Sequence, residues 1–395
     1  MDSPKSTVEY LHHLPLEIWR EILLEVYPPM LSAAYSESPS MRIAHTIIKS
    51  SNLAQARRAE LRLICKRFEP LGLEALFNEI AVRCGKESLE RLFDALDSMH
   101  RVELPTLRTT GVLIDFDAAG GWRDAQVELS GTLLCRLTQY CPRIKLMLLY
   151  APNTAYHNWP MEWIVGVEKL IIDTVILKSA SLLEISNLSP FLDTLALNVD
   201  ILELHKPVAF PCLTRLCLDV RWTNITVSLL TLPSIRWLSM SIDDSDHADT
   251  MAFFGARGQQ LDYLELRSYT TDLEAAVRAI MDILSLCPRL DVFEVDGHLV
   301  DAAQPRPTLL STHTLVLNFA KADGVVAAAL RWWGFASNGD APPSVKTVVI
   351  QITGHKDLTK DALKHLVLSE ITSLSIQSIV TFVVKPIHYG AGQIA

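Results

Sequence analysis

Residues 211–218, PCLTRLCL, decide the fold, because their pattern of one proline and three apolar residues recurs along the chain. The same spacing is found at 190–197 (PFLDTLAL), 233–240 (PSIRWLSM) and 288–295 (PRLDVFEV). Less regular copies occupy 142–149, 261–266, 343–350 and 371–376. The first apolar positions of successive clear units, 192, 213, 235, 261 and 290, lie 21 to 29 residues apart. Such a period is typical of an array of similar units stacked side by side.

Each unit contains one short stretch with the two-residue period of a β-strand. The pattern predicts that its leucines are buried, namely Leu195, Leu197, Leu216, Leu218, Leu238, Leu264 and Leu266. The residues between them are expected to face outward, among them Ala196, Cys217, Ser239 and Glu265. Amphipathic stretches at 272–286, 324–335 and 359–368 predict helices between the strands.

A different pattern marks the N-terminal segment. Residues 14–26, LPLEIWREILLEV, begin with a proline, which suits the first turn of a helix because an N–H would have no partner there. Ile18, Ile22 and Val26 recur at four-residue steps and predict a helix with one apolar face. A second amphipathic stretch covers 52–68, and the alternating residues 80–82 read as a strand.

Together these N-terminal motifs resemble an F-box, the three-helix module that docks onto the Skp adaptor of cullin-RING ubiquitin ligases. The matching motifs are LPxEIxxxIL at 14–23, LICKRF at 63–68 and LFxxI at 76–80, with Phe68 standing where the family usually has Trp. The resemblance implies an adaptor-binding set of Leu14, Pro15, Ile18, Ile22, Leu23, Ile64, Cys65 and Phe68.

The repeated units resemble the leucine-rich repeat, in the irregular form found behind F-boxes. The resulting expectation is an α/β fold, with a small all-helical F-box module followed by a leucine-rich-repeat solenoid shaped as a horseshoe. The expected boundaries are 1–90 for the helical module with an inserted loop, 91–376 for the repeats and 377–395 for a C-terminal tail. A doubly wound α/β domain also alternates strands and helices, and it remains the alternative.

Composition narrows the classes of partner. Lys and Arg number 36 against 45 Asp and Glu, which gives a net charge of −9, so no overall positive field favours nucleic acid or an anionic membrane. The uncharged runs are too short and too polar to span a bilayer. We therefore expect a cytoplasmic or nuclear protein. Seven cysteines without a C-x-x-C pair suggest reduced packing residues rather than disulfides or a zinc site.

No motif for bond chemistry is found in the sequence. It contains no G-x-S-x-G, no phosphate-binding glycine loop and no H-E-x-x-H, so we expect no catalytic residue, no metal and no cofactor. Binding is the remaining class. Aromatic and arginine side chains are enriched at interface hot spots, and several fall on the outward positions of neighbouring strands. The expected client-binding set is Arg221, Trp237, Tyr263, Arg267, Tyr269 and Glu294.

The resemblance and the residues together predict a substrate-recognition subunit of a Skp/cullin/F-box ubiquitin ligase. The N-terminal segment would bind the Skp adaptor and through it the cullin, while the repeats would bind a client protein. The alternative is a ligase-independent scaffold in which a degenerate F-box acts as an N-terminal cap. A hydrolase or transferase on an α/β fold is a third class, and it would need a polar pocket with converging titratable groups.

Overall fold

The structure of the 395-residue chain is a computed structural model. The described residues are 15, 17–19, 21–22, 71, 77–83, 86–101, 109–115, 135–156, 162–242, 247–268, 272–297, 299, 309, 311–319, 325–333, 335, 344–353, 360–373 and 381–387. They divide between two compact units, one comprising Met1–Ala151 with Trp159–Val167 and the other comprising Pro152–Asn158 with Glu168–Ala395.

Among the described residues, the first unit contains three parallel strands and the helix α6 (Lys86–Arg101). Its elements are β1 (Glu79–Arg83), α6, β2 (Gly111–Asp115), a helical stretch at 135–140, the first part of β3 (Leu146–Tyr156) and the 3-10 turn η2 (Glu162–Ile164). Strand β1 pairs with β2, and β2 pairs with β3, all in parallel. Every residue of β2 is buried, as is usual for a central parallel strand.

In the second unit strands and helices alternate along the chain. The strands are β4 (Lys169–Lys178), β5 (Thr194–Leu204), β6 (Val208–Ala209), β7 (Arg215–Ile225), β8 (Leu230–Thr231), β9 (Trp237–Ile242), β10 (Tyr263–Ser268), β11 (Val292–Asp296), β12 (Thr314–Phe319), β13 (Thr347–Thr353) and β14 (Thr381–Ile387). The helices and 3-10 turns are α8 (Ser179–Leu188), η3 (Val227–Leu229), α9 (His247–Arg257), η5 (Gly258–Gln260), α10 (Leu273–Leu286), α11 (Val325–Trp332) and α12 (Lys360–Ser373).

The strand order corrects the predicted fold class. The described strands form mainly one parallel sheet of twelve strands, in the order β1-β2-β3-β4-β5-β7-β9-β10-β11-β12-β13-β14, with a separate β6-β8 pair. The sheet does not close into a barrel within the described residues. The prediction of a small all-helical module followed by a solenoid is therefore wrong. One cause is plain in residues 1–90, where Ile80 and its neighbours form β1 and enter the sheet. Strand β14 likewise lies inside the segment 377–395 that was expected to be a tail.

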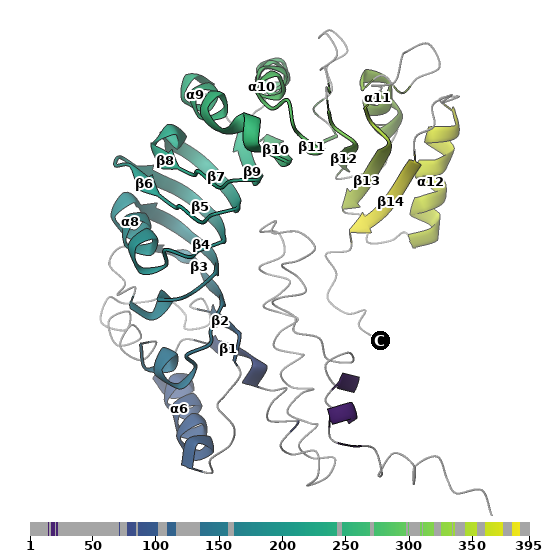
Figure 1. The fold of residues 1–395 in the computed structure, drawn as a ribbon. Coiled ribbons are helices and arrows are strands. Elements are labelled where there is room, and N and C mark those ends of the chain that lie inside the picture. Colours follow the sequence, from purple (N-terminus) through teal and green to yellow (C-terminus); the bar gives the residue numbers. More distant parts are fainter. Residues whose placement is uncertain are drawn as a thin grey trace, which may run out of the picture. The chain divides into compact units, whose positions relative to one another are not determined.

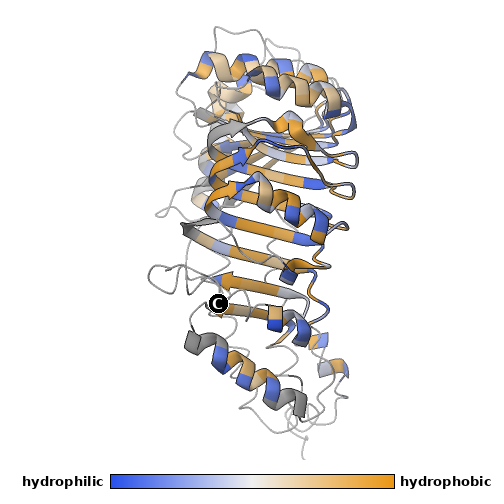
Figure 2. Cartoon of the chain, turned by 90° about the vertical axis from the view of Figure 1, so that its left-hand side faces the viewer, coloured by the Kyte–Doolittle hydropathy of each residue, from blue (hydrophilic) through white to orange (hydrophobic). Residues whose placement is uncertain are grey.

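The two faces of the second unit's strands differ. Helices α8 to α11 lie on one face of the strands, as Figure 1 shows. The leucines of the repeated motif point to that face, and all seven predicted to be buried are at most 3% exposed, so this prediction is confirmed. Hydrophobic residues dominate the strands along their length (Figure 2). The predicted helices are also confirmed as α10, α11 and α12.

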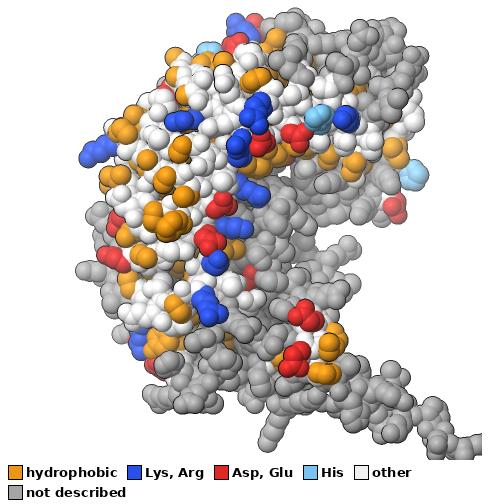
Figure 3. Space-filling view, viewed as in Figure 1, with side chains coloured by type: hydrophobic (Ala, Val, Ile, Leu, Met, Phe, Trp, Pro, Cys, Tyr) orange, Lys and Arg blue, Asp and Glu red, His pale blue; other side chains and the backbone are white. Residues whose placement is uncertain are grey.

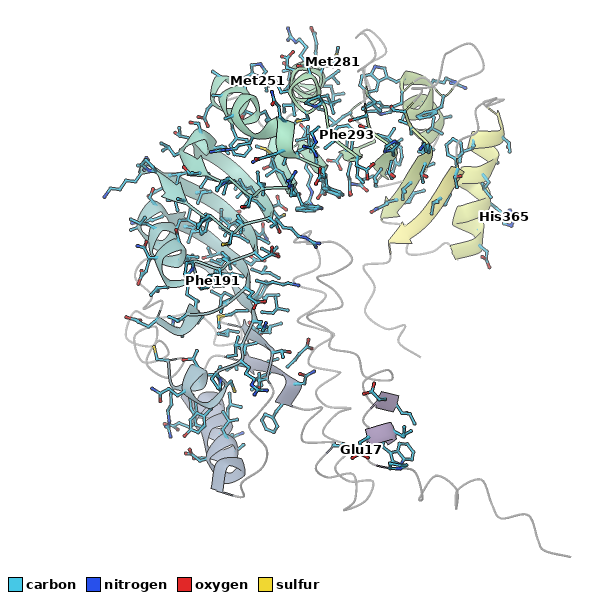
Figure 4. All side chains as sticks on the ribbon, viewed as in Figure 1. Glu17, Phe191, Met251, Met281, Phe293 and His365 are labelled. Atoms are coloured by element: carbon cyan, nitrogen blue, oxygen red, sulfur yellow. The ribbon has the colours of Figure 1, made fainter. Side chains whose placement is uncertain are left out.

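The face opposite the helices carries the remaining side chains of each strand. Phe293 of β11 lies on the helix side, where its ring packs edge-on against Trp333 with centroids 5.8 Å apart (Figure 4). Its neighbour Glu294 therefore points the other way, by the two-residue period of the strand. We call this second surface the polar face.

Candidate binding site

Six polar side chains from four strands of the sheet lie together on the polar face, within the stretch β7-β9-β10-β11-β12. This polar cluster consists of Asp219 from β7, Tyr263, Glu265 and Arg267 from β10, Glu294 from β11 and Asn318 from β12. Parallel pairing in register brings the cluster together, because Glu265 lies opposite Glu294 across the β10–β11 pair. Adjacent strands lie about 4.8 Å apart, so side chains at the same register position are neighbours.

Arg267 is the positive centre of the polar cluster and is only 5% exposed. Its Nε and Nη2 both reach Oε1 of Glu265, at 2.7 and 2.6 Å, and its Nη1 lies 3.1 Å from Oδ2 of Asp219. Burial alone would lower the pKa of Arg267, but the negative charges of Glu265 and Asp219 hold it well above its ordinary value. The guanidinium is therefore fixed as a cation with both of its ends engaged.

Glu294 is another buried carboxylate of the polar cluster, with a side chain in a residue that is 8% exposed. The hydroxyl of Tyr263 donates to its Oε2, and Nδ2 of Asn318 donates to its Oε1 at 2.7 Å. Burial raises the pKa of Glu294 to about 7, and the nearby charge of Glu265 adds to the shift. Near neutral pH this carboxyl is thus divided between its protonated and ionised forms.

An aromatic pair borders the polar cluster. Trp237 of β9 and Tyr263 of β10 are register partners, and their rings stack with centroids 4.7 Å apart and planes 16° from parallel. Both side chains are half-buried, so part of the stacked surface remains accessible. Burial, followed by the charges of Glu294 and Glu265, raises the pKa of Tyr263 well above its usual range, so its hydroxyl stays a donor.

Small buried residues lie on the β7 and β9 side of the polar cluster. Cys217 and Ser239 are each 1% exposed. Cys217 is the register partner of Ser239, and Ser239 is the register partner of Glu265. Burial raises the pKa of the Cys217 thiol to about 12, which leaves it an unreactive packing group. The hydroxyl of Ser241 donates to the backbone oxygen of Val220 at 2.9 Å and so ties β9 to β7.

These contacts change the interpretation of the predicted client-binding residues. Arg267 and Glu294 are buried and paired, whereas the sequence predicted them as exposed contacts. Of the four members of this set whose side chains are described, Trp237 and Tyr263 keep accessible surface. Arg221 lies in β7 with its side chain outside the described residues, and Tyr269 lies outside them altogether. The predicted outward exposure of Ala196, Cys217, Ser239 and Glu265 is wrong, since each is at most 2% exposed.

Three of the predicted adaptor-binding residues are described. Pro15 is exposed, and its carbonyl accepts a hydrogen bond from Trp19 N at 3.2 Å, which fits a helix starting at this proline. Ile18 is 45% exposed and Ile22 is half-buried, both in helical conformation. The other predicted adaptor contacts lie outside the described residues: Leu14, Leu23, Ile64, Cys65 and Phe68.

The client-binding set predicted from the sequence does not include Asp219, Glu265 or Asn318. A signal for the first two exists, because each occupies an outward position of a strongly patterned unit, one residue after a buried leucine. Asn318 follows Leu317 outside the regular repeats, and it could be assigned only once β12 was paired with β11.

The surface around the strands also carries exposed charges. Acidic and basic side chains form a band along this part of the molecule in Figure 3. Two exposed ion pairs belong to this unit: His313 lies 2.6 Å from Asp291, and Arg236 lies 4.0 Å from Asp262, with all four side chains about half exposed. Such solvated pairs are worth at most about 1 kcal/mol each, so they contribute little beside the buried cluster.

Among the described residues, none of the helices has the length and apolar character needed to cross a membrane. The chain was also compared with known proteins. No protein-family model matches it, and the search of curated proteins finds no significant match.

Proposed function

We propose that this chain is the substrate-recognition subunit of a Skp/cullin/F-box ubiquitin ligase. Its N-terminal segment binds the Skp adaptor and through it the cullin, and its polar face binds a client protein. The chain performs no bond chemistry and uses no cofactor in this role. It acts in the cytoplasm or the nucleus, where the ligase core and its clients meet.

The stacked Trp237–Tyr263 pair is the observation that carries the client-binding part of the proposal. A half-buried aromatic pair next to a fixed charged network is the composition of an interface hot spot, where ring surface supplies most of the binding energy. Support for the adaptor-binding part comes from Ile18, a large apolar side chain in a helical segment that is left 45% exposed. Covering such a side chain gains about 1.5–3 kcal/mol.

A crossover experiment tests both parts. Full-length tagged protein is purified from cells in which ligase activity is blocked, and the adaptor and client proteins are identified by mass spectrometry. The Ile18→Asp/Ile22→Asp variant should lose the adaptor and keep the clients, because it places charges in an apolar contact. Trp237→Ala should keep the adaptor and lose the clients.

Phe191→Ala is the matched control. It also removes a large aromatic side chain, one that is 73% exposed and lies away from the polar face, after α8 (Figure 4). It should keep both kinds of partner. Retention of the adaptor by the double aspartate variant would favour the alternative scaffold function, and an unchanged client list in Trp237→Ala would remove the polar face from client binding.

A further inference from the structure

The polar cluster contains acceptor atoms that nothing among the described residues satisfies. Oε2 of Glu265, a side chain that is 2% exposed, has no hydrogen-bond partner, although its Oε1 is held by Arg267. Oδ1 of Asn318, two strands away on the same face, also lacks a partner. Buried polar atoms are nearly always hydrogen-bonded, so unmet acceptors on both sides of Glu294 indicate a missing donor.

The charges of the polar cluster indicate that the missing donor is positively charged. Among the described residues, three carboxylates, from Asp219, Glu265 and Glu294, lie near one guanidinium, that of Arg267. The guanidinium of Arg267 bonds to Asp219 and Glu265, and among the described side chains the hydrogen-bond donors to Glu294 are the neutral groups of Tyr263 and Asn318. Placing two carboxylates at directly opposed positions of a sheet is unfavourable unless a cation lies near them.

The neighbouring groups indicate an organic cation. Within the described residues, no three His, Cys, Asp or Glu side chains are arranged as metal ligands. The stacked rings of Trp237 and Tyr263 lie beside the carboxylates and offer apolar surface to a side-chain stem and a π face to its charged end. A phosphate or another acid would meet a cluster in which the carboxylates outnumber the guanidinium, and it is disfavoured.

We infer that the polar cluster is a socket for an arginine or lysine side chain of the client protein. The incoming group donates to Oε2 of Glu265 and Oδ1 of Asn318, places its charge between Glu265 and Glu294, and rests its stem on the Trp237–Tyr263 pair. This inference rests on the proposed function, because it names the chemistry by which the polar face recognises its client.

Binding of a cation should also be linked to release of a proton. Glu294 faces Tyr263, Glu265 and Arg267 on β10 and Asn318 on β12, and its carboxyl is partly protonated near neutral pH. A positive charge placed beside it favours the ionised form. Affinity for a basic peptide should therefore rise as the pH increases through about 7.

The test is selection from a displayed library of random dodecapeptides on the immobilised full-length protein. We expect the selected peptides to share one position occupied by arginine or lysine. Replacing an arginine there by citrulline, which keeps the shape and removes the charge, should weaken binding about tenfold or more, as expected for loss of a charged hydrogen bond.

Matched variants locate the socket. Glu265→Gln and Glu294→Gln keep the side-chain shape and should each weaken the selected peptide about tenfold. Asp173→Asn is the control, because Asp173 is another buried carboxylate of the same unit, on β4, and is hydrogen-bonded to Asn198 at 3.0 Å. It should bind like the wild type, and circular dichroism checks that every variant is folded.

The outcomes separate the two proposals. A library that gives no binder, gives binders without a shared basic position, or gives peptides that bind equally to wild type and to both glutamine variants overturns the socket. Client proteins lost in Trp237→Ala would still support the proposed function in that case. Clients retained in Trp237→Ala would instead contradict the proposed function itself.

Discussion

At the scale of single residues, the cost of burying Glu294 is the most informative feature. An isolated carboxylate avoids a low-dielectric site by taking up a proton, and two fixed donors only partly offset that tendency. Tyr263 and Asn318 supply those donors, while Glu265 lies on the adjacent strand with the same charge. The pKa of Glu294, about 7, is the result of burial and the charge of Glu265, which raise it, and of the two hydrogen bonds, which lower it.

This balance predicts a pH-dependent stability difference between wild type and Glu294→Gln. The pKa of Glu294 is higher in the folded than in the unfolded chain, so its favourable contribution is complete below about pH 4.5 and is lost as the pH rises through about 7. Relative to Glu294→Gln, the wild type should lose up to about 3 kcal/mol over that range. Urea unfolding at a series of pH values measures the difference.

Asp173→Asn serves as the reference for this titration, since it changes a buried carboxylate outside the polar cluster. Asp173→Asn leaves Glu294 in place, so the loss of stability that depends on Glu294 should persist in this variant and be absent from Glu294→Gln. Parallel curves for wild type and Glu294→Gln would mean that Glu294 titrates alike in the folded and unfolded chains, contrary to its burial.

At the scale of elements, two glycines around α9 and η5 offer a matched comparison. Gly255 lies in α9 with no atom within 4 Å of where a Cβ would stand, whereas a Cβ on Gly258 would lie 2.4 Å from the carbonyl oxygen of Leu286. Gly255→Ala should stabilise the protein by about 0.5–1 kcal/mol through helix propensity. Gly258→Ala should destabilise it by about 1–3 kcal/mol, because η5 and α10 must separate. Shifts of the same sign in urea unfolding would contradict this packing.

The strands predict a second contrast, between their two faces. Leu216→Ala removes a side chain that is 1% exposed and should cost about 2–5 kcal/mol. The sequence suggested that Glu265→Ala is a surface change worth no more than about 0.5 kcal/mol. The structure leads us to expect a loss of about 1–3 kcal/mol, because Arg267 would lose one of its two buried partners. If Glu265→Ala were as stable as the wild type, Asp219 alone would be enough to satisfy the guanidinium of Arg267.

These elements also show how far the sequence could be read. The spacing of proline and apolar residues located β5, β7, β9, β10 and β11 and identified which residues pack against the helices, because a two-residue period fixes one face of a strand. It could not show that the opposite face is also buried. Cys217 and Glu265 are buried although their positions alternate with leucine, because Ser239 lies beside Cys217 in register and Arg267 contacts Glu265.

The candidate site was harder to predict because its contacts are remote in sequence. Arg267 and Asp219 are 48 residues apart along the chain, and Glu294 and Asn318 are 24 apart. Each pair meets only when the strand register is known, and a register shift of one residue would send these side chains to the other face. The sequence therefore indicated Trp237 and Tyr263 as aromatic contacts but could not separate exposed charges from buried, paired ones.

At the scale of the whole molecule, the excess of acidic residues favours the kind of partner proposed for the polar cluster. The chain carries a net charge of −9, so a basic segment is attracted from a distance while an acidic one is repelled. Long-range attraction acts mainly on the rate of association, and contacts in the socket act mainly on the rate of dissociation. The two contributions can therefore be measured separately.

We predict that salt and mutation change different rate constants for the selected basic peptide. Raising the salt concentration from about 0.05 to about 0.5 M should slow its association about tenfold, because the screening length falls well below the size of the protein. Glu265→Gln removes one of the chain's 45 acidic residues and should leave that salt dependence nearly unchanged, while it speeds dissociation about tenfold through loss of the buried contact. Surface plasmon resonance at several salt concentrations measures both constants. Association that does not respond to salt would show that the peptide is held by apolar surface alone, and a slower association without faster dissociation in Glu265→Gln would place its basic side chain outside the socket.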